Sequence, residues 1–412
     1  MDELADGTKG AALPLIRGDL HLSYGQVGLL LAAPLLAGGL LELPLGLVAG
    51  QGRRRHFLVL AGGGLVAASL VAVAVSRSLA ALTVAFIAFF PASGAFVSLT
   101  QAALMDAAPG RHQRRMAAWN LAGSAGAVCG PLLLAVVLAA GGGWRSGYLL
   151  LAAAACAALL AAAIGGPARL GEPARASMAG RSRQEPGPRA VPKGGGEPGG
   201  QAVGTDPASS GADGRRPSIR QALGALGEGE VARWLALLQI GDLLLDVLTG
   251  YVGIYLVDVA HASPAQAAFG VAIRLGGGLA GDAGFVAVSD RISGRTAVAA
   301  SAVAAAVLYP AFLLVPPLAA KLAILAVLSA ATACWYPAMQ AGLYGSLPGR
   351  SDIAVFWSSA AGLAGAIGPL GVGLLAQRAG LSWALAALAA VPAAVLVVLP
   401  RAGRARSPRV LR

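Results

Sequence analysis

Two aspartates interrupt one of the long apolar stretches of the chain. Residues 234–257 read WLALLQIGDLLLDVLTGYVGIYLV, and Asp242 and Asp246 are the acidic residues in it. Positions i and i+4 share one face of a helix, so both carboxylates point the same way. A carboxylate in apolar surroundings needs a counter-charge, a proton or water. The pair could therefore carry protons, act as the counter-charge of a cationic substrate, or form a structural ion pair.

Further charged residues lie in apolar stretches where they could join these two. Arg274 and Asp282 are about two helical turns apart and lie on nearly one face. Burial favours the neutral form of a carboxyl group and a nearby arginine favours the ionised form, so a site with both can alternate between the two. We predict proton coupling or substrate binding for Asp6, Glu42, Asp242, Asp246, Arg274 and Asp282, lined by Tyr251, Tyr255, Trp335 and Tyr336.

Three alternatives stay open for these residues. The carboxylates could form an inert pair with Arg274, and Asp242 could lie at the edge of the membrane. The aromatic side chains could serve packing or an interfacial belt, where such rings are common.

Composition places these residues in a membrane. The 412 residues are 57% hydrophobic and 12% charged, with a mean hydropathy of +0.70, whereas soluble domains carry about 25% charged residues. Apolar stretches of about 20 residues, enough to cross a bilayer as helix, recur throughout. We expect an all-α, polytopic membrane protein. An aspartate facing lipid at the bilayer centre would cost about 2.5–3.5 kcal/mol, so the pair should face a polar cavity or partners.

Other function classes find little support in the sequence. The net charge of +12 is distributed over short loops and a tail, so we expect no nucleic-acid partner. The three cysteines fall in apolar segments and the four histidines show no ligand spacing, so neither a metal nor a cofactor is expected. Because no nucleophile elbow or phosphate loop is found, we predict that the protein is not an enzyme.

The expected spanning helices form two groups. They cover residues 24–50, 57–76, 79–105, 114–140 and 146–165, and then 233–258, 264–289, 296–318, 321–346, 352–376 and 381–400. Residues 2–16 can supply only about 22 Å of helix and cannot span alone. We therefore expect a truncated first helix: either the true start lies upstream of Met1, or the sequence is a shortened form of the protein.

The segment between the two groups is rich in Gly, Pro, Ser and Arg and predicts a disordered connector, with a regulatory role as the alternative. The expected domains are an N-terminal helical half (1–166), a linker ending in a short interfacial helix (167–231), a C-terminal helical half (232–400) and a basic tail (401–412). Lys and Arg are more numerous in the loops on the linker side, which the positive-inside rule places in the cytoplasm. That predicts a multi-pass plasma-membrane protein with linker and C-terminus cytoplasmic.

The two groups of helices repeat one another in sequence. Asp2 and Asp6 align with Asp242 and Asp246, Ser23 and Gln26 with Ser263 and Gln266, and Glu42 with Asp282. Further on, QAALMDAAPGR (101–111) aligns with QAGLYGSLPGR (340–350), and Gly130-Pro131 with Gly368-Pro369. We expect two six-helix halves related by an internal parallel repeat, a twelve-helix architecture in which the substrate site lies between the halves.

The chain resembles the major facilitator superfamily over nearly its whole length. Its signature, G-x-L-A-D-R-x-G-R-R, is similar to GLVAGQGRRR (46–55), where Gly50 replaces the aspartate, and to GFVAVSDRISGR (284–295). The resemblance implies a cytoplasmic gating motif and an acid that pairs with loop arginines. The residues concerned are Gly46, Gly52, Arg53, Arg54, Arg55, Asp106, Asp290, Arg291 and Arg295.

Two further resemblances favour export. GSAGAVCGP (123–131) is similar to the glycine motif of drug–proton antiporters through Gly126, Gly130 and Pro131, and Gly368 and Pro369 repeat its end. Close helix packing is the alternative explanation for these glycines. Residues 20–48 resemble the second-helix region of fosmidomycin-resistance-type exporters.

We therefore predict a secondary active transporter that expels small amphipathic organic molecules in exchange for protons by alternating access, as in drug resistance. One alternative is a proton-coupled symporter that imports a metabolite. Another is a membrane sensor or binding protein that transports nothing.

Overall fold

The computed structural model describes residues 2–48, 53–106, 112–164, 227, 229–289, 291–347 and 351–399. The first half consists of α1 (Asp2–Asp19), α2 (Tyr24–Val48), α3 (Arg53–Val75), α4 (Leu79–Asp106), α5 (His112–Ala139) and α6 (Trp144–Ile164). The second half begins with α9 (Gly229–Asp258), α10 (Pro264–Val288) and α11 (Gly294–Leu314). It continues with α12 (Leu318–Thr332), α13 (Trp335–Ser346), α14 (Ser351–Gly365), α15 (Gly368–Ala379), α16 (Leu381–Ala387), the 3-10 helix η2 (Leu388–Ala390) and α17 (Val391–Val398).

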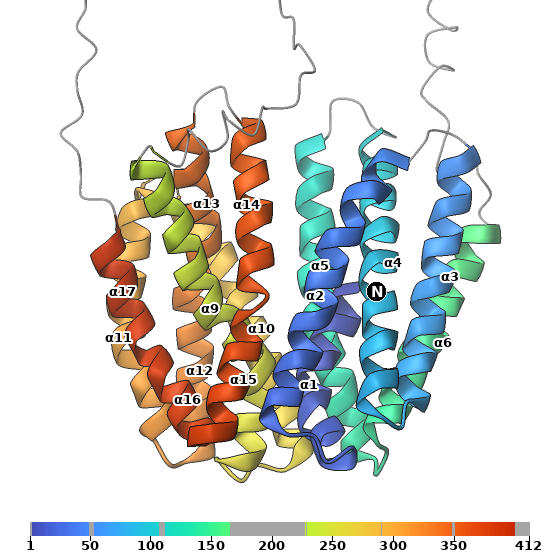
Figure 1. The fold of residues 1–412 in the computed structure, drawn as a ribbon, viewed down its shortest axis with the longest axis horizontal. Coiled ribbons are helices and arrows are strands. Elements are labelled where there is room, and N and C mark those ends of the chain that lie inside the picture. Colours follow the sequence, from blue (N-terminus) through green and yellow to red (C-terminus); the bar gives the residue numbers. More distant parts are fainter. Residues whose placement is uncertain are drawn as a thin grey trace, which may run out of the picture.

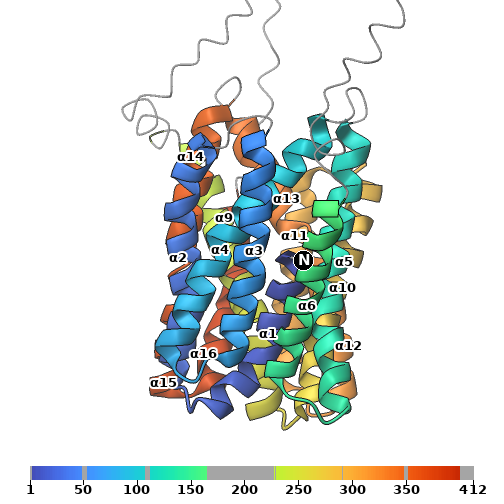
Figure 2. The ribbon, with the colours of Figure 1, turned by 90° about the vertical axis from the view of Figure 1, so that its right-hand side faces the viewer.

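Two bundles of roughly parallel and antiparallel helices stand side by side, one built from each half of the chain (Figures 1 and 2). Within the described residues, eight helical segments are long and apolar enough to cross a membrane. The all-helical, polytopic fold predicted from the sequence is thereby confirmed. Of the expected linker (167–231) the structure describes only residues 227 and 229–231, so the connector and most of the expected domain boundaries lie outside the described residues.

The ends of the bundles define two faces. We call the end with the turns at residues 20–23, 76–78, 140–143, 259–263 and 315–317 the short-loop face. The opposite end, where α6 ends and α9 begins, is the linker face (Figure 1). Helix α1 starts about halfway up the bundle and runs to the short-loop face (Figure 1). It has 18 residues against 30 in its counterpart α9, so the short first helix is confirmed.

The internal repeat extends to the details of the turns. Ser23 and Gln26 form a reciprocal pair of hydrogen bonds at the start of α2, and Ser263 and Gln266 do the same at α10. This capping box satisfies backbone N–H groups that the helix leaves unpaired. His21 and His261 precede these caps and share a positive φ of 50° and 52°. The predicted repeat therefore holds at the level of single dihedral angles.

The halves differ in the continuity of their long helices. α4 and α5 are unbroken helices of 28 residues each. Their counterparts are interrupted: Ala333 and Cys334 separate α12 from α13, and Ala366 and Ile367 separate α14 from α15. Pro369 lies in the first turn of α15, a position that proline favours because it donates no backbone hydrogen bond there.

Small residues bring the halves into contact toward the short-loop face. A side chain on Gly28 of α2 would lie 2.8 Å from the backbone of Pro369 and Leu370 in α15. On α9, one on Gly253 would lie 2.9 Å from the carbonyl oxygen of Gly10 in α1. Such glycines let helix backbones approach closely.

Candidate substrate and proton site

The repeated aspartates place acidic groups from both halves near one another. Asp6 of α1 and Asp246 of α9 influence each other electrostatically across the boundary between the bundles. Helix α1 packs against α5, α9 and α10, yet the Asp6 side chain is 48% exposed and Asp246 is also exposed. Solvent therefore reaches both carboxylates although their helices lie within the packed assembly.

Two cations accompany these acids, one from each half. Lys9 and Arg274 both act on Asp246. The guanidinium of Arg274 is buried and lies in the field of Asp246 and Asp282. Among the described residues it forms no ion pair within 4.0 Å, and its Nε has no hydrogen-bond partner. Arg274 thus balances the charge of Asp246 and Asp282 at a distance.

The other predicted acids surround this pair. Asp242 is half-buried one turn from Asp246, and the two interact electrostatically. Asp282 is exposed. The structure brings Asp6, Asp242, Asp246, Arg274 and Asp282 into one group of interacting charges, in which carboxylates outnumber cations.

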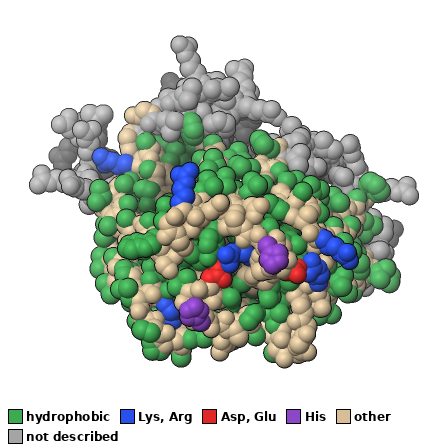
Figure 3. All heavy atoms as spheres, turned by 60° about the horizontal axis from the view of Figure 1, so that its bottom comes forward, with side chains coloured by type: hydrophobic (Ala, Val, Ile, Leu, Met, Phe, Trp, Pro, Cys, Tyr) green, Lys and Arg blue, Asp and Glu red, His purple; other side chains and the backbone are tan. Residues whose placement is uncertain are grey.

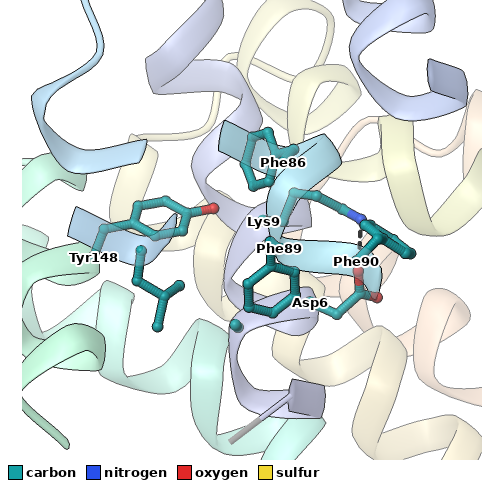
Figure 4. A pocket seen from close by; sticks show the side chains of 8 residues that line it. Asp6, Lys9, Phe86, Phe89, Phe90 and Tyr148 are labelled. Atoms are coloured by element: carbon teal, nitrogen blue, oxygen red, sulfur yellow. Dashed lines mark hydrogen bonds and ion pairs between the residues drawn. The ribbon is translucent and has the colours of Figure 1, made fainter. Parts of the chain in front are cut away.

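The first half contains partners that sequence reasoning missed. Lys9 Nζ donates a hydrogen bond to Asp6 Oδ1 at 2.5 Å and lies 5.0 Å from the centre of the Phe90 ring. Ser93 of α4 donates a hydrogen bond to Asp2. Figure 4 shows Asp6, Lys9 and Phe90 at a small pocket that Tyr148 of α6 also lines. The spacing of Lys9 three residues after Asp6 was the available signal.

Of the four predicted lining aromatics, three belong to the packed interior. The Tyr251 hydroxyl donates to the Pro369 carbonyl at 2.9 Å, and Tyr255 donates to the Leu313 carbonyl at 3.0 Å. The Trp335 indole is fully buried and donates to Ser301. In contrast, Tyr336 is 54% exposed and lies in the field of Asp242. Only Tyr336 therefore has the exposure that contact with a transported molecule requires.

The antiporter-like glycine motif is a packing surface between α1 and α5. A side chain on Gly130 would collide with the carbonyl oxygen of Leu4 and lie 2.7 Å from the Thr8 hydroxyl. On the α1 side, one on Gly7 would collide with the Ala127 carbonyl and lie 3.1 Å from Pro131. Gly126 is less crowded, with Glu3 and Leu4 atoms at 3.6 Å. The motif fixes the helix that presents Asp6.

Most of the gating motif lies outside what the structure describes. Gly52 and Asp290 fall outside the described residues, and no side-chain surroundings are described for Glu42, Gly46, Arg53, Arg54, Arg55 and Asp106. Arg291 is exposed and Arg295 half-buried near the start of α11. The gating role of these residues remains a prediction.

The short-loop face has a cross-half cluster that was not predicted. Arg17 of α1 donates to Asp258 at the end of α9 at 2.5 Å, and the Tyr24 hydroxyl of α2 donates to the same carboxylate at 2.8 Å. The Arg17 guanidinium also lies 4.2 Å from the centre of the Tyr24 ring. Charged side chains of both signs lie close together on this face (Figure 3). We call Arg17, Tyr24 and Asp258 the short-loop latch, because they join the two halves.

The two helix bundles contact each other toward the short-loop face, and exposed charged residues lie at the boundary between them. This arrangement is that of a membrane transporter. The profile described as Major Facilitator Superfamily matches residues 4–282, and the chain belongs to that superfamily. Its members are transporters and not enzymes, and they move substrates by alternating access.

Solved structures agree with this assignment. A bacterial homologue of the human lysosomal transporter Spinster, in an inward-facing and unoccupied conformation, is similar with a TM-score of 0.71 and 14% identity. The match covers 97% of this chain and 93% of that one. The nucleoside transporter NupG is similar with a TM-score of 0.66 and 12% identity, covering 97% and 95% of the chains. No curated protein sequence matches the chain.

Proposed function

We propose that the protein exports small amphipathic organic molecules across the plasma membrane in exchange for protons. The observation that supports this most directly is the exposed pair of carboxylates at the boundary of the halves: Asp6 is paired with Lys9, and Asp246 lies in the field of Arg274 without an ion pair among the described residues. An exchanger needs a group that either a proton or a substrate can neutralise. These carboxylates have the chemistry for both.

The coupling follows from repulsion between like charges. Two ionised carboxylates that face each other across the boundary oppose closer approach of the bundles around them. A proton removes one of the charges, and a cationic group of the substrate balances it. Movement between the two access states would then require one or the other, which is the condition for exchange. Asp242 and Asp282 extend the acidic surface, and Arg274 stabilises whichever carboxylate is ionised.

The orientation we propose comes from the loop charges. Arginines concentrate at the linker face, which the positive-inside rule assigns to the cytoplasm. The short-loop latch would then close the outer side, and the carboxylates would be reached from within, as in the inward-facing conformation of the Spinster homologue. The gating motif around Arg53–Arg55 and Asp106 would close the cytoplasmic side in the other state.

The test is Asp246→Asn in proteoliposomes with an imposed proton gradient. The amide keeps the volume and polarity of the side chain but cannot carry a proton, so gradient-driven efflux of a lipophilic cationic dye should fall to background. Glu230→Gln is the matched control, because Glu230 is an exposed acid at the start of the same helix. Wild-type transport with an unchanged pH profile in Asp246→Asn would refute the proposal. Proton flux in the same direction as the dye would identify a symporter instead.

A further inference from the structure

The pocket beside Asp6 is small and has room for one small polar group such as an ammonium, so the rest of a ligand would lie outside it. It is lined by residues of four helices of the first half: Ala5, Asp6, Lys9, Leu70, Phe86, Phe89, Phe90 and Tyr148. Figure 4 shows the phenylalanine rings around the Lys9 side chain, with the Tyr148 hydroxyl directed toward the same space. An aromatic enclosure that contains one carboxylate is the usual environment for an organic cation.

A second observation independently indicates a missing partner. Tyr148 is fully buried, and its hydroxyl has no hydrogen-bond partner in the part of the chain that the structure describes. The ring is held in place by edge contacts with Phe86 and Trp144, whose ring centres lie 6.3 and 6.1 Å away. Leaving a buried hydroxyl unpaired costs about 1–3 kcal/mol. A ligand that hydrogen-bonds this hydroxyl would recover that cost.

Lys9 indicates which chemical group the pocket accepts. Its ammonium makes one hydrogen bond in the described structure, to Asp6, and lies over the Phe90 ring. The side chain is only 13% exposed, whereas Asp6 is 48% exposed. A ligand ammonium could therefore reach Asp6 from the solvent side and displace that of Lys9. The position of the Lys9 head group is where a primary ammonium of a substrate would be held.

We infer that Asp6, Phe90 and Tyr148 form the binding site for the ammonium of an organic cation with an apolar body, and that Lys9 is its tethered competitor. The inference rests on the proposed function, of which it names the substrate class. On binding, the substrate ammonium takes over Asp6, and the Lys9 ammonium is displaced from it. An anionic substrate is disfavoured, because it would have to displace Asp6 and then lie close to Asp246.

Substrate affinity is therefore set by competition within the chain. A group tethered by a short linker competes at an effective concentration in the mM range. Lys9→Gln removes that competitor and leaves the carboxylate free, so it should strengthen binding. Asp6→Asn removes the counter-charge, and loss of a charge-assisted hydrogen bond should weaken binding about tenfold or more.

The experiment is calorimetric titration of the purified full chain at pH 7 with three probes of equal length: 4-phenylbutylammonium, 4-phenylbutanol and 4-phenylbutyrate. We expect the ammonium to bind more tightly than the other two probes, about tenfold more tightly to Lys9→Gln than to the wild type, and about tenfold or more weakly to Asp6→Asn. Lys9→Arg keeps the positive charge and should behave like the wild type. Tyr148→Phe should weaken ammonium binding several-fold and leave the binding of the alcohol less affected.

Weaker or unchanged binding of the ammonium to folded Lys9→Gln would overturn the inference, as would preferential binding of the carboxylate. Thermal unfolding of each variant verifies the fold, and Lys9→Met is the second charge-removing variant if Lys9→Gln is unstable.

Asp246→Asn separates the two proposals. If it loses proton-driven transport and still binds the ammonium, both stand. Transport by the wild type without ammonium binding contradicts this inference alone, and binding without proton-driven transport contradicts the proposed function alone.

Discussion

Helices α1 and α9 carry the same pair of aspartates and balance them differently. In α1 the counter-charge is on the same helix, since Lys9 is hydrogen-bonded to Asp6. In α9 it comes from α10, where Arg274 is buried and forms no ion pair within 4.0 Å with described residues. The repeat thus has an ion-paired carboxylate in α1 and, in α9, a carboxylate without an ion pair among the described residues. That asymmetry would let one half hold the substrate and the other the proton.

The difference between the two helices can be removed by giving α9 the lysine–aspartate pair that α1 has. Thr249 occupies the position in α9 that Lys9 has in α1. In Thr249→Lys the new ammonium can pair with Asp246 three residues earlier, as such pairs do on helices. Because a charge-assisted hydrogen bond would then hold Asp246 ionised, we expect proton-coupled transport to fall about tenfold or more. Stopped-flow measurement of proton flux in proteoliposomes checks this, with Thr249→Gln as the uncharged control of similar length.

The packing of α1 against α5 inside the first half offers a second test. In Gly130→Ala the new methyl group meets the Leu4 carbonyl, which belongs to backbone and cannot turn aside. We expect destabilisation of about 1–3 kcal/mol, seen as a lower melting temperature in detergent. Gly123→Ala is the control, since its nearest neighbour is 3.5 Å away. Gly368→Ala, the counterpart in the second half, meets only the end of the Leu243 side chain at 2.9 Å and should be milder. Equal effects of the three substitutions would contradict the packing role.

The smallest effect is expected at the short-loop latch. Arg17 and Asp258 are 26% and 22% exposed, and pairs that water reaches contribute about 0–1 kcal/mol. Asp258→Asn should therefore shift the population of the state closed at this face by up to about fivefold. Distances between spin labels at positions 143 and 316, measured by double electron–electron resonance, would report the shift. Asp19→Asn breaks an ion pair with Arg145 inside the first half and should leave the distances unchanged.

The fold was predictable because its signals are long and repeated. Apolar stretches of membrane-spanning length mark the helices whatever their neighbours are. The alignment of Ser23-Gln26 with Ser263-Gln266 predicted the repeat, and both pairs form the same cap. The acidic residues could be predicted as a group because a carboxylate in an apolar segment is costly wherever the helix lies.

The contacts of the site were not predictable, because they depend on how each helix is rotated and docked. Asp258 pairs with Arg17 from the other half, and nothing in the local sequence connects them. Trp335 was predicted as a lining candidate but lies in the core, where its indole donates a hydrogen bond to Ser301 of α11. Nothing in the sequence distinguishes Tyr148 from the other aromatic residues. What distinguishes it is the burial of its hydroxyl without a hydrogen-bond partner among the described residues.

The interrupted helices give the molecule an uneven stiffness. Helices α4 and α5 are continuous, although each contains a proline, Pro91 and Pro131, at which a helix can bend. The corresponding helices of the second half are interrupted between α12 and α13 and between α14 and α15, where fewer helical hydrogen bonds resist bending. We therefore expect the second half to bend at Ala333–Cys334 and Ala366–Ile367 during closure, as hinges rather than as rigid supports.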